Sequence, residues 1–263
     1  MISIHHETHY QYSKAPVQSV QRLHLTPSSS DAQQIKHWQI DLEGTDMVFS
    51  CRDHHGNIVH IAAQNTQNTD IKITASGKVE TKDVLGVAGR HDNFLPLDLY
   101  RQETDYCKPG PALRKLEAKM PKSDEDISFL HDLSAYVTDQ VTYQKAKTNS
   151  QTDAEFAAAQ GSGVCQDHVH IFLTLARRKG FAARYVSGYL VTPAELAHQA
   201  THAWAEVHVK GLGWVGFDIS NGISPDQNYI KLASGFDYRD VQPVAGMRFG
   251  DGTEVMTTEV SSQ

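Results

Sequence analysis

Cys165 has the residue type and the setting that nucleophilic catalysis requires. It follows the segment Gly161–Val164 and precedes apolar residues at +4, +7, +8 and +11, which predicts that it begins a helix. The free backbone N–H groups at a helix N-terminus favour a thiolate and can hold the oxygen of an attacked carbonyl. This placement predicts a reactive thiol that acts on a carbonyl compound.

A base and a residue that orients it follow at a spacing that fits one β-hairpin. His202 and Asp218 lie in two consecutive segments that alternate like strands. If residues 210–212 form a three-residue loop, Val209 pairs with Gly213, and His202 and Asp218 lie on one sheet face within reach of each other. A four-residue loop would place them on opposite faces, because side chains alternate along a strand. The predicted chemistry therefore depends on this register.

The elements around these residues indicate an α+β protein. Residues 1–80 contain short apolar runs separated by turn-forming residues, which predicts an antiparallel β-sandwich-like domain. Residues 81–111 have weak periodicity and several glycines and prolines, which is typical of a connector. Helical stripes follow, and the chain then returns to strands, the last near 253–260, without a βαβ alternation. The predicted division is a β-rich domain over 1–100 and a catalytic core over 101–263.

Composition and charge exclude some classes of partner. The chain has 263 residues, of which 24 are Lys or Arg and 31 are Asp or Glu, so its net charge is −7. An acidic chain without a basic run is a poor candidate for binding nucleic acid. No stretch approaches the length of apolar sequence that a membrane-spanning helix needs. We therefore expect neither nucleic acid nor membrane as a partner, while the oligomeric state stays open.

The beginning of the chain and its cysteines predict a reducing compartment. The first residues do not form a basic segment followed by an apolar one, so no secretion signal is expected. The cysteines are Cys51, Cys107 and Cys165, an odd number with no short metal-binding spacing. Free thiols and a cytoplasmic location follow as expectations.

The 15 histidines raise the question of a metal site. His168 and His170 are two residues apart on the predicted helix, so their side chains point in different directions. No H-E-x-x-H sequence and no calcium-loop spacing occur. The sequence therefore predicts no metal ion and no cofactor.

Several blocks of sequence resemble the bacterial transglutaminase-like family, whose members are often described as candidate cysteine proteases. The four blocks of the core are Gly163–Asp167, Phe181–Tyr189, Thr201–Trp204 and Gly213–Asp218. The spacings of 37 residues from Cys165 to His202 and 16 from His202 to Asp218 suit that family. Residues 8–17 and 23–27 resemble its N-terminal domain, and residues 235–241 with Pro243 resemble its C-terminal block. The resemblance covers nearly the whole chain and implies a transglutaminase/papain-like core, with helices packed on an antiparallel sheet.

The resemblance implies a Cys-His-Asp catalytic triad. Cys165 would be the nucleophile, His202 the base and later the acid, and Asp218 the residue that orients the imidazole. The resemblance implies a protein or peptide as substrate. The implied reaction is acyl transfer at an amide or peptide bond through a thioester, with hydrolysis by a protease or amidase as the preferred form. An amine in place of water would make the enzyme a transglutaminase. A non-catalytic protein- or peptide-binding module on the same fold is the alternative of another class.

Four further residues are candidates for the oxyanion hole or the walls of the cleft. The backbone N–H of Gln166 follows the nucleophile, and Tyr143 follows the first long helix. His168 lies in the first turn of the nucleophile helix, where the family usually has other residue types. Trp204 is two residues from His202, and sheet packing is the ordinary role of a tryptophan at such a position.

Overall fold

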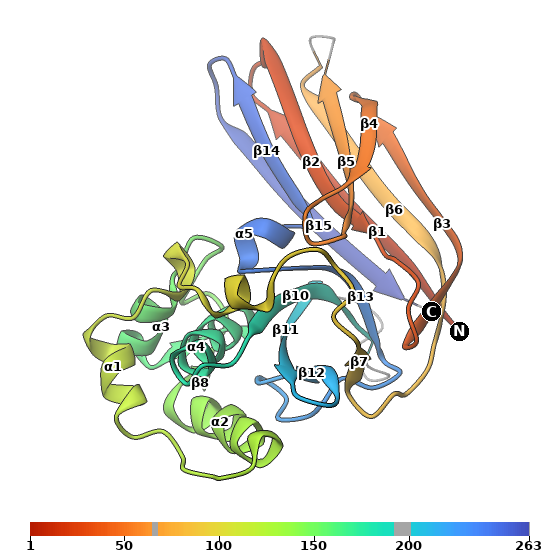
Figure 1. Ribbon diagram of the computed structural model, residues 1–263. Helices are drawn as coiled ribbons and strands as arrows, with labels where there is room; N and C mark the ends of the chain where they lie inside the picture. The colour runs from red at the N-terminus through yellow and green to blue at the C-terminus, as the bar shows by residue number, and fades with distance from the viewer. Residues whose placement is uncertain (65–67, 192–200, 263) are drawn as a thin grey trace.

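The chain forms an elongated sandwich of two sheets and a rounded part in which helices pack on a third sheet (Figure 1). The computed structural model describes residues 1–64, 68–191 and 201–262. The three large sheets are antiparallel, and the helices lie in the second part. The predicted α+β fold is therefore confirmed.

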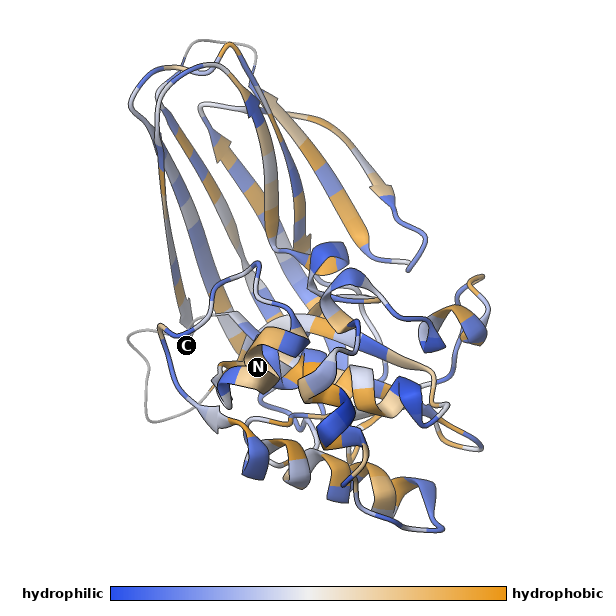
Figure 2. Ribbon diagram, turned by 90° about the vertical axis from the view of Figure 1, so that its left-hand side faces the viewer, coloured by the Kyte–Doolittle hydropathy of each residue, from blue (hydrophilic) through white to orange (hydrophobic). Residues whose placement is uncertain are grey.

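The inner strands of the sandwich alternate between buried and more exposed side chains. Every second residue of β1 (Ile2–Tyr12) is buried, and Figure 2 shows hydrophobic and hydrophilic residues alternating along the strands. This period of two lets both sheets cover one core, which includes Leu23, Leu25, Ile71 and Ile73. The sheets have the orders β15-β1-β6-β3 and β14-β2-β5-β4. The other strands are β2 (Gln18–Thr26), β3 (Gln33–Glu43), β4 (Asp46–Arg52), β5 (Ile58–Gln64), β6 (Asp70–Thr81), β14 (Val244–Phe249) and β15 (Glu254–Ser262).

The last strands of the chain complete both sheets of the sandwich. β15 pairs with β1 and β14 pairs with β2, so the two ends of the chain lie side by side (Figure 1). The strand expected near 253–260 is present within β15. The predicted division at 1–100 and 101–263 therefore does not follow the sheets over 244–262. Pairing between distant segments leaves no mark on the local pattern from which that division was predicted.

The core sheet has the strand order β13-β10-β11-β12-β7, and α4 (Cys165–Arg178) packs on β10 and β11. Val169, Phe172 and Leu173 of α4 are buried in this interface. Further helices surround α4, and a short parallel pair, β8 with β9, lies near its N-terminus. The elements are β7 (Val87–Gly89), α1 (Pro111–Glu117), α2 (Asp126–Gln140), β8 (Thr142–Tyr143), α3 (Ala154–Gln160), β9 (Ser162–Gly163), β10 (Ala183–Leu190), β11 (Thr201–Val209), β12 (Gly213–Phe217), β13 (Tyr229–Gly235) and α5 (Tyr238–Val241). Two 3₁₀ helices, η1 (Leu97–Arg101) and η2 (Asp105–Cys107), lie between β7 and α1.

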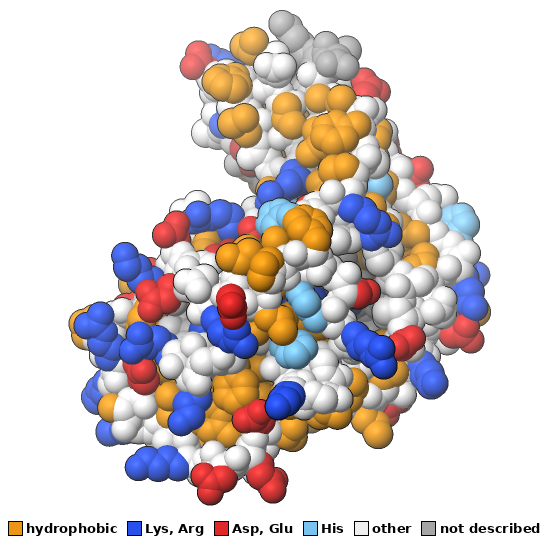
Figure 3. Space-filling view, viewed as in Figure 1, with side chains coloured by type: hydrophobic (Ala, Val, Ile, Leu, Met, Phe, Trp, Pro, Cys, Tyr) orange, Lys and Arg blue, Asp and Glu red, His pale blue; other side chains and the backbone are white. Residues whose placement is uncertain are grey.

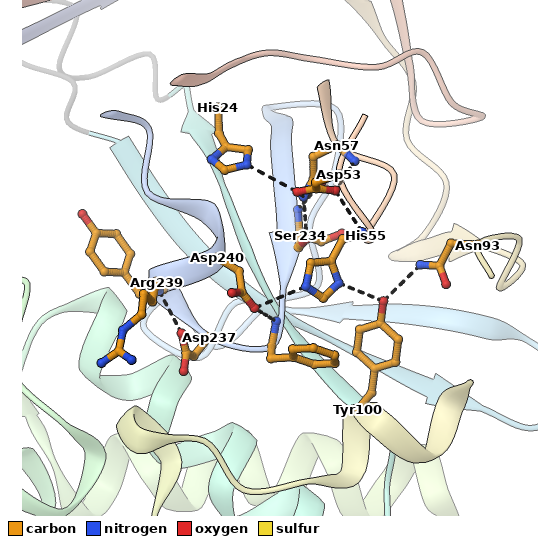
Figure 4. A network of polar contacts seen from close by, with 12 residues as sticks. His24, Asp53, His55, Asn57, Asn93, Tyr100, Ser234, Asp237, Arg239 and Asp240 are labelled. Atoms are coloured by element: carbon orange, nitrogen blue, oxygen red, sulfur yellow. Dashed lines mark hydrogen bonds and ion pairs between the residues drawn. The ribbon is translucent and has the colours of Figure 1, made fainter. Parts of the chain in front are cut away.

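A polar network joins the sandwich to the core (Figure 4). Asn57, in the turn between β4 and β5, makes two hydrogen bonds of 2.9 Å with the backbone of Ser234 in β13. His55 of the same turn lies 3.1 Å from the Tyr100 hydroxyl and 3.2 Å from the Asp240 carboxylate. Side chains of the sandwich thus reach β13, α5 and η1, and they fix the sandwich beside the core sheet.

Candidate active site

The Cys165 thiol lies partly exposed at the N-terminus of α4. Asp167 accepts hydrogen bonds from the Val164 backbone N–H at 2.7 Å and from the Thr148 hydroxyl at 2.6 Å. A Cβ at Gly163 would stand only 2.6 Å from the Asp167 side chain, so the approach of these two residues requires glycine. The start of the helix, and with it the position of the thiol, is held by these contacts.

His202 lies at the beginning of β11, between the thiol and a buried carboxylate. Its Nε2 is 2.6 Å from Asp218 Oδ2, and the Cys165 thiol is near enough to contribute to the raised pKa of the ring. With Nε2–H donated to the carboxylate, Nδ1 is the nitrogen left for the thiol. Burial opposes a charge on this ring, but the hydrogen bonds and charges of Asp218 and Cys165 raise the pKa of His202 to about 10. An imidazolium is therefore favoured beside Cys165.

The hairpin that carries the base has the predicted register. Val209 pairs with Gly213, so residues 210–212 form a three-residue loop between β11 and β12. Asp218 directly follows β12 and meets His202 across the hairpin. The expectation that this register brings the two side chains together is confirmed.

Asp218 is fully buried and accepts several hydrogen bonds. Besides His202, its Oδ2 accepts a bond of 2.6 Å from the Tyr229 hydroxyl and one of 2.7 Å from Asn221 Nδ2. Burial alone would raise the pKa of Asp218, but the bond to His202 and its charge, followed by the bonds from Tyr229 and Asn221, hold this pKa below its usual value. The group is therefore an ionised carboxylate that orients the imidazole.

Sequence reasoning missed both of these partners. Asn221 follows Asp218 by three residues, and its backbone N–H also donates to Asp218 Oδ1, at 3.3 Å. That spacing is typical of an aspartate-initiated turn, so a local signal was present. Tyr229 comes from β13, and nothing in the sequence near Asp218 indicates it.

Two of the predicted cleft residues lie close to the thiol. Tyr143 is 46% exposed, and burial followed by the charges of Cys165 and Asp218 raises its pKa. Tyr143 also pairs with Gly163 in the β8–β9 pair, two residues before the nucleophile. Gln166 is partly exposed, and its side chain donates to the Ser150 carbonyl at 3.3 Å. Its backbone N–H lies in the first turn of α4, and its role as an oxyanion donor stays a prediction.

The other two cleft candidates are buried. Trp204 is 3% exposed, and its ring lies 6.5 Å from the His202 ring, nearly parallel to it. The prediction that His168 lines the cleft is wrong, because this side chain has no exposed surface. Its Nε2 lies 2.9 Å from the Val141 carbonyl and its Nδ1 lies 3.0 Å from the Ser220 hydroxyl. His168 therefore connects α4 to the end of α2 and to the segment after Asp218.

The part of the chain that the structure describes contains no cluster of three or more His, Cys, Asp or Glu side chains that could hold a metal ion. Within the same residues, no helix combines the length and the apolar character needed to cross a membrane.

Comparison with known sequences shows the family of this chain. Residues 114–219 match the transglutaminase-like superfamily, and residues 2–80 match the bacterial transglutaminase-like N-terminal region. An uncharacterized protein of Mycobacterium tuberculosis is 31% identical over 92% of this chain and 85% of its own length. An uncharacterized protein of Mycobacterium leprae is 25% identical over 94% of this chain and 92% of its own. The chain belongs to the transglutaminase-like superfamily.

A solved structure has the same fold over nearly the whole chain. It is a candidate cysteine protease from Cytophaga hutchinsonii, with a TM-score of 0.79 and 21% sequence identity. The match covers 99% of this chain and 90% of that one. The sandwich and the core thus occur together, in the same arrangement, in another member of the fold.

Proposed function

We propose that this protein is a cysteine-dependent acyl-transfer enzyme that hydrolyses amide or peptide bonds through a thioester on Cys165. The observation that supports this most strongly is the arrangement of three side chains. The Cys165 thiol at the N-terminus of α4 is near enough to His202 to help raise the pKa of its ring, and His202 Nε2 lies 2.6 Å from the buried Asp218 carboxylate. A nucleophile, a base and an orienting carboxylate in this order are the parts that thiol catalysis needs.

The proposed reaction has two halves. The Cys165 thiolate attacks the carbonyl carbon, a C–S bond forms, and the first-turn N–H groups of α4, including that of Gln166, stabilise the oxyanion. The C–N bond then breaks, and the leaving amine takes the proton of the His202 imidazolium. Water next gives a proton to His202 while its oxygen bonds to the carbonyl carbon. The C–S bond breaks, the acid product leaves, and the thiolate is restored.

A large pocket between the sandwich and the core sheet lies beside the candidate active site, although Cys165, His202 and Asp218 are not among the residues that line it. It has a volume of about 1170 Å³ and is lined by charged, amide and aromatic side chains from both parts. Trp204 and Tyr229 belong to its lining, and the rings of both lie beside His202. Figure 3 shows histidine and basic side chains gathered where the sandwich meets the core. Such a lining suits the polar backbone and side chains of a peptide.

Alkylation of the three cysteines tests the proposal without a known substrate. Peptide mass spectrometry would follow iodoacetamide labelling of each cysteine from pH 5 to 9, in the wild type and in His202→Ala. Exposed Cys51 and buried Cys107 serve as internal controls. We expect Cys165 to react well below pH 8 in the wild type and to lose this reactivity in His202→Ala, whereas His9→Ala should leave it unchanged.

The opposite result would favour the non-catalytic module. If Cys165 reacts only at the pH of an ordinary thiol, about 8.5, and is insensitive to His202, no thiolate–imidazolium pair exists. The fold would then serve binding alone.

The acceptor distinguishes a hydrolase from a transglutaminase. After acylation of Cys165 by p-nitrophenyl acetate, the products formed with and without a primary amine would be compared. We expect acetate as the main product in both cases, because the partly exposed thiol leaves the thioester open to water. Acetamide formation that saturates with amine concentration would instead identify a transglutaminase.

A further inference from the structure

Three donors converge on one oxygen of Asp218. Its Oδ2 accepts hydrogen bonds from His202 at 2.6 Å, from Tyr229 at 2.6 Å and from Asn221 at 2.7 Å. A carboxylate oxygen offers two lone pairs, so these donors share its electron density and each weakens the hold on the others. Orientation of the imidazole requires only the first of these bonds. The other two bonds therefore reduce the negative charge that Asp218 presents to His202.

The hydroxyl of Tyr229 is held rigidly toward Asp218. Tyr229 is the first residue of β13, is 6% exposed, and packs edge-to-face on Trp204 with ring centroids 5.4 Å apart. Its own ring centroid lies 6.0 Å from that of His202. Burial, together with the charge of Asp218, raises its pKa, so the phenol stays protonated and remains a donor. Tyr229 thus cannot replace His202 as the group that exchanges a proton.

The geometry points to Tyr229 as a positioning residue that sets the proton affinity of His202 through Asp218. By donating to Oδ2, the phenol competes with the imidazole N–H and reduces the attraction of the carboxylate for the imidazolium. The imidazolium is then stable enough to form beside the thiol and yet able to release its proton to a leaving amine. The consequence for rate rests on the proposed function, whereas the effect on His202 is independent of it.

Histidine titration by NMR tests this inference in the Cys165→Ala background, where no acyl transfer can occur. Protein labelled with ¹⁵N-histidine would be titrated with and without Tyr229→Phe, and the His202 resonance would be identified from its loss in a His202 variant. Phenylalanine keeps the ring contacts with Trp204 but removes the donor. We expect the midpoint of His202 to rise by about half a pH unit or more, because a charge-assisted hydrogen bond is lost from Asp218.

Tyr189→Phe is the matched control. Tyr189 is also buried, and its hydroxyl lies 2.7 Å from His6 of the sandwich, so this variant loses a buried tyrosine contact elsewhere. It should leave the midpoint of His202 unchanged. An unchanged midpoint in folded Tyr229→Phe, or an equal shift in Tyr189→Phe, would overturn the inference.

Fluorotyrosine incorporation provides a second measurement if Tyr229→Phe does not fold. A fluorinated phenol is a stronger donor of nearly the same shape, so the midpoint of His202 should fall. No change would again overturn the inference. If the midpoint moves as expected while Cys165 alkylates like an ordinary thiol, the role of Tyr229 stands and the proposed function fails.

Discussion

Strand β11 carries two buried charged clusters four residues apart, and only one has the composition of an active site. At one end, His202 binds Asp218 and keeps a second ring nitrogen for the thiol. At the other, Glu206 Oε2 lies 2.6 Å from Arg184 and 2.8 Å from Lys231. Burial would raise the pKa of Glu206, but these two cations lower it to about 2. The comparison teaches that buried charge alone does not define a site, because at Glu206 both cations are held by one carboxylate and the described residues form no pair of nucleophile and base there.

The largest expected effect comes from removing the charge of Asp218. Asp218→Asn keeps the shape of the side chain but leaves the His202 imidazolium without its anionic partner. We expect acylation of Cys165 by p-nitrophenyl acetate, followed as release of nitrophenolate, to slow by about 10³-fold or more. If Asp218→Asn acylates at the wild-type rate, the Asp218 carboxylate has no part in acylation, and the His202 cluster is no more catalytic than the Glu206 cluster.

The matching substitution in the second cluster should affect folding instead. Glu206→Gln leaves Arg184 and Lys231 without the carboxylate that neutralises them, and loss of one partner in a buried ion pair costs about 3–5 kcal/mol. Urea unfolding should report this loss, whereas the pH profile of Cys165 alkylation in the folded variant should stay as in the wild type. A shifted alkylation profile would contradict the separation of the two clusters.

The two clusters should also respond to pH in opposite directions. The pKa of His202 is raised from 6.5 to about 10, so its contribution to stability is complete below pH 6.5 and is lost as the pH rises through 10. The pKa of Glu206 is lowered from 4.5 to about 2, so its contribution is complete above pH 4.5 and is lost as the pH falls through 2. Unfolding free energies across pH should show a deficit of about 2 kcal/mol in His202→Gln that shrinks above neutral pH. The deficit of Glu206→Gln should shrink only in acid, and the reverse pattern would refute these assignments.

The smallest effect is expected from the second cation of the Glu206 cluster. Lys231→Met leaves Arg184 on Glu206, with its guanidinium 4.0 Å from the Trp214 ring. Burial and the nearby Arg184 already lower the pKa of Lys231 to about 8, so its charge is poorly stabilised. We expect a loss of about 1 kcal/mol or less in urea unfolding. A loss as large as that of Glu206→Gln would show that Lys231, rather than Arg184, neutralises the carboxylate.

Local sequence patterns predicted the parts of the site that neighbouring residues determine. The glycine-containing turn and the apolar stripe placed Cys165 at the start of α4. The three-residue loop at 210–212 brought His202 and Asp218 together, because a hairpin register is determined by the length of its loop.

Features that depend on distant segments could not be predicted in this way. Tyr229 reaches Asp218 from another strand, and β14 and β15 follow the core in the chain but pair with strands near its beginning. The sequence placed His168 in the first turn of α4 but did not show that Val141 and Ser220 would enclose it. Helical spacing gives the face of a side chain, whereas its exposure depends on what other segments pack over that face.

The central claim is that Cys165 becomes acylated with the help of His202 and Asp218. Peptide-mapping mass spectrometry after brief reaction with p-nitrophenyl acetate at pH 7 tests it most directly. The account predicts an acetyl group on Cys165, removable by hydroxylamine, absent in Cys165→Ala and much slower to appear in Asp218→Asn. Acetylation confined to exposed Cys51 or to surface lysines, with Cys165 unmodified, would contradict it.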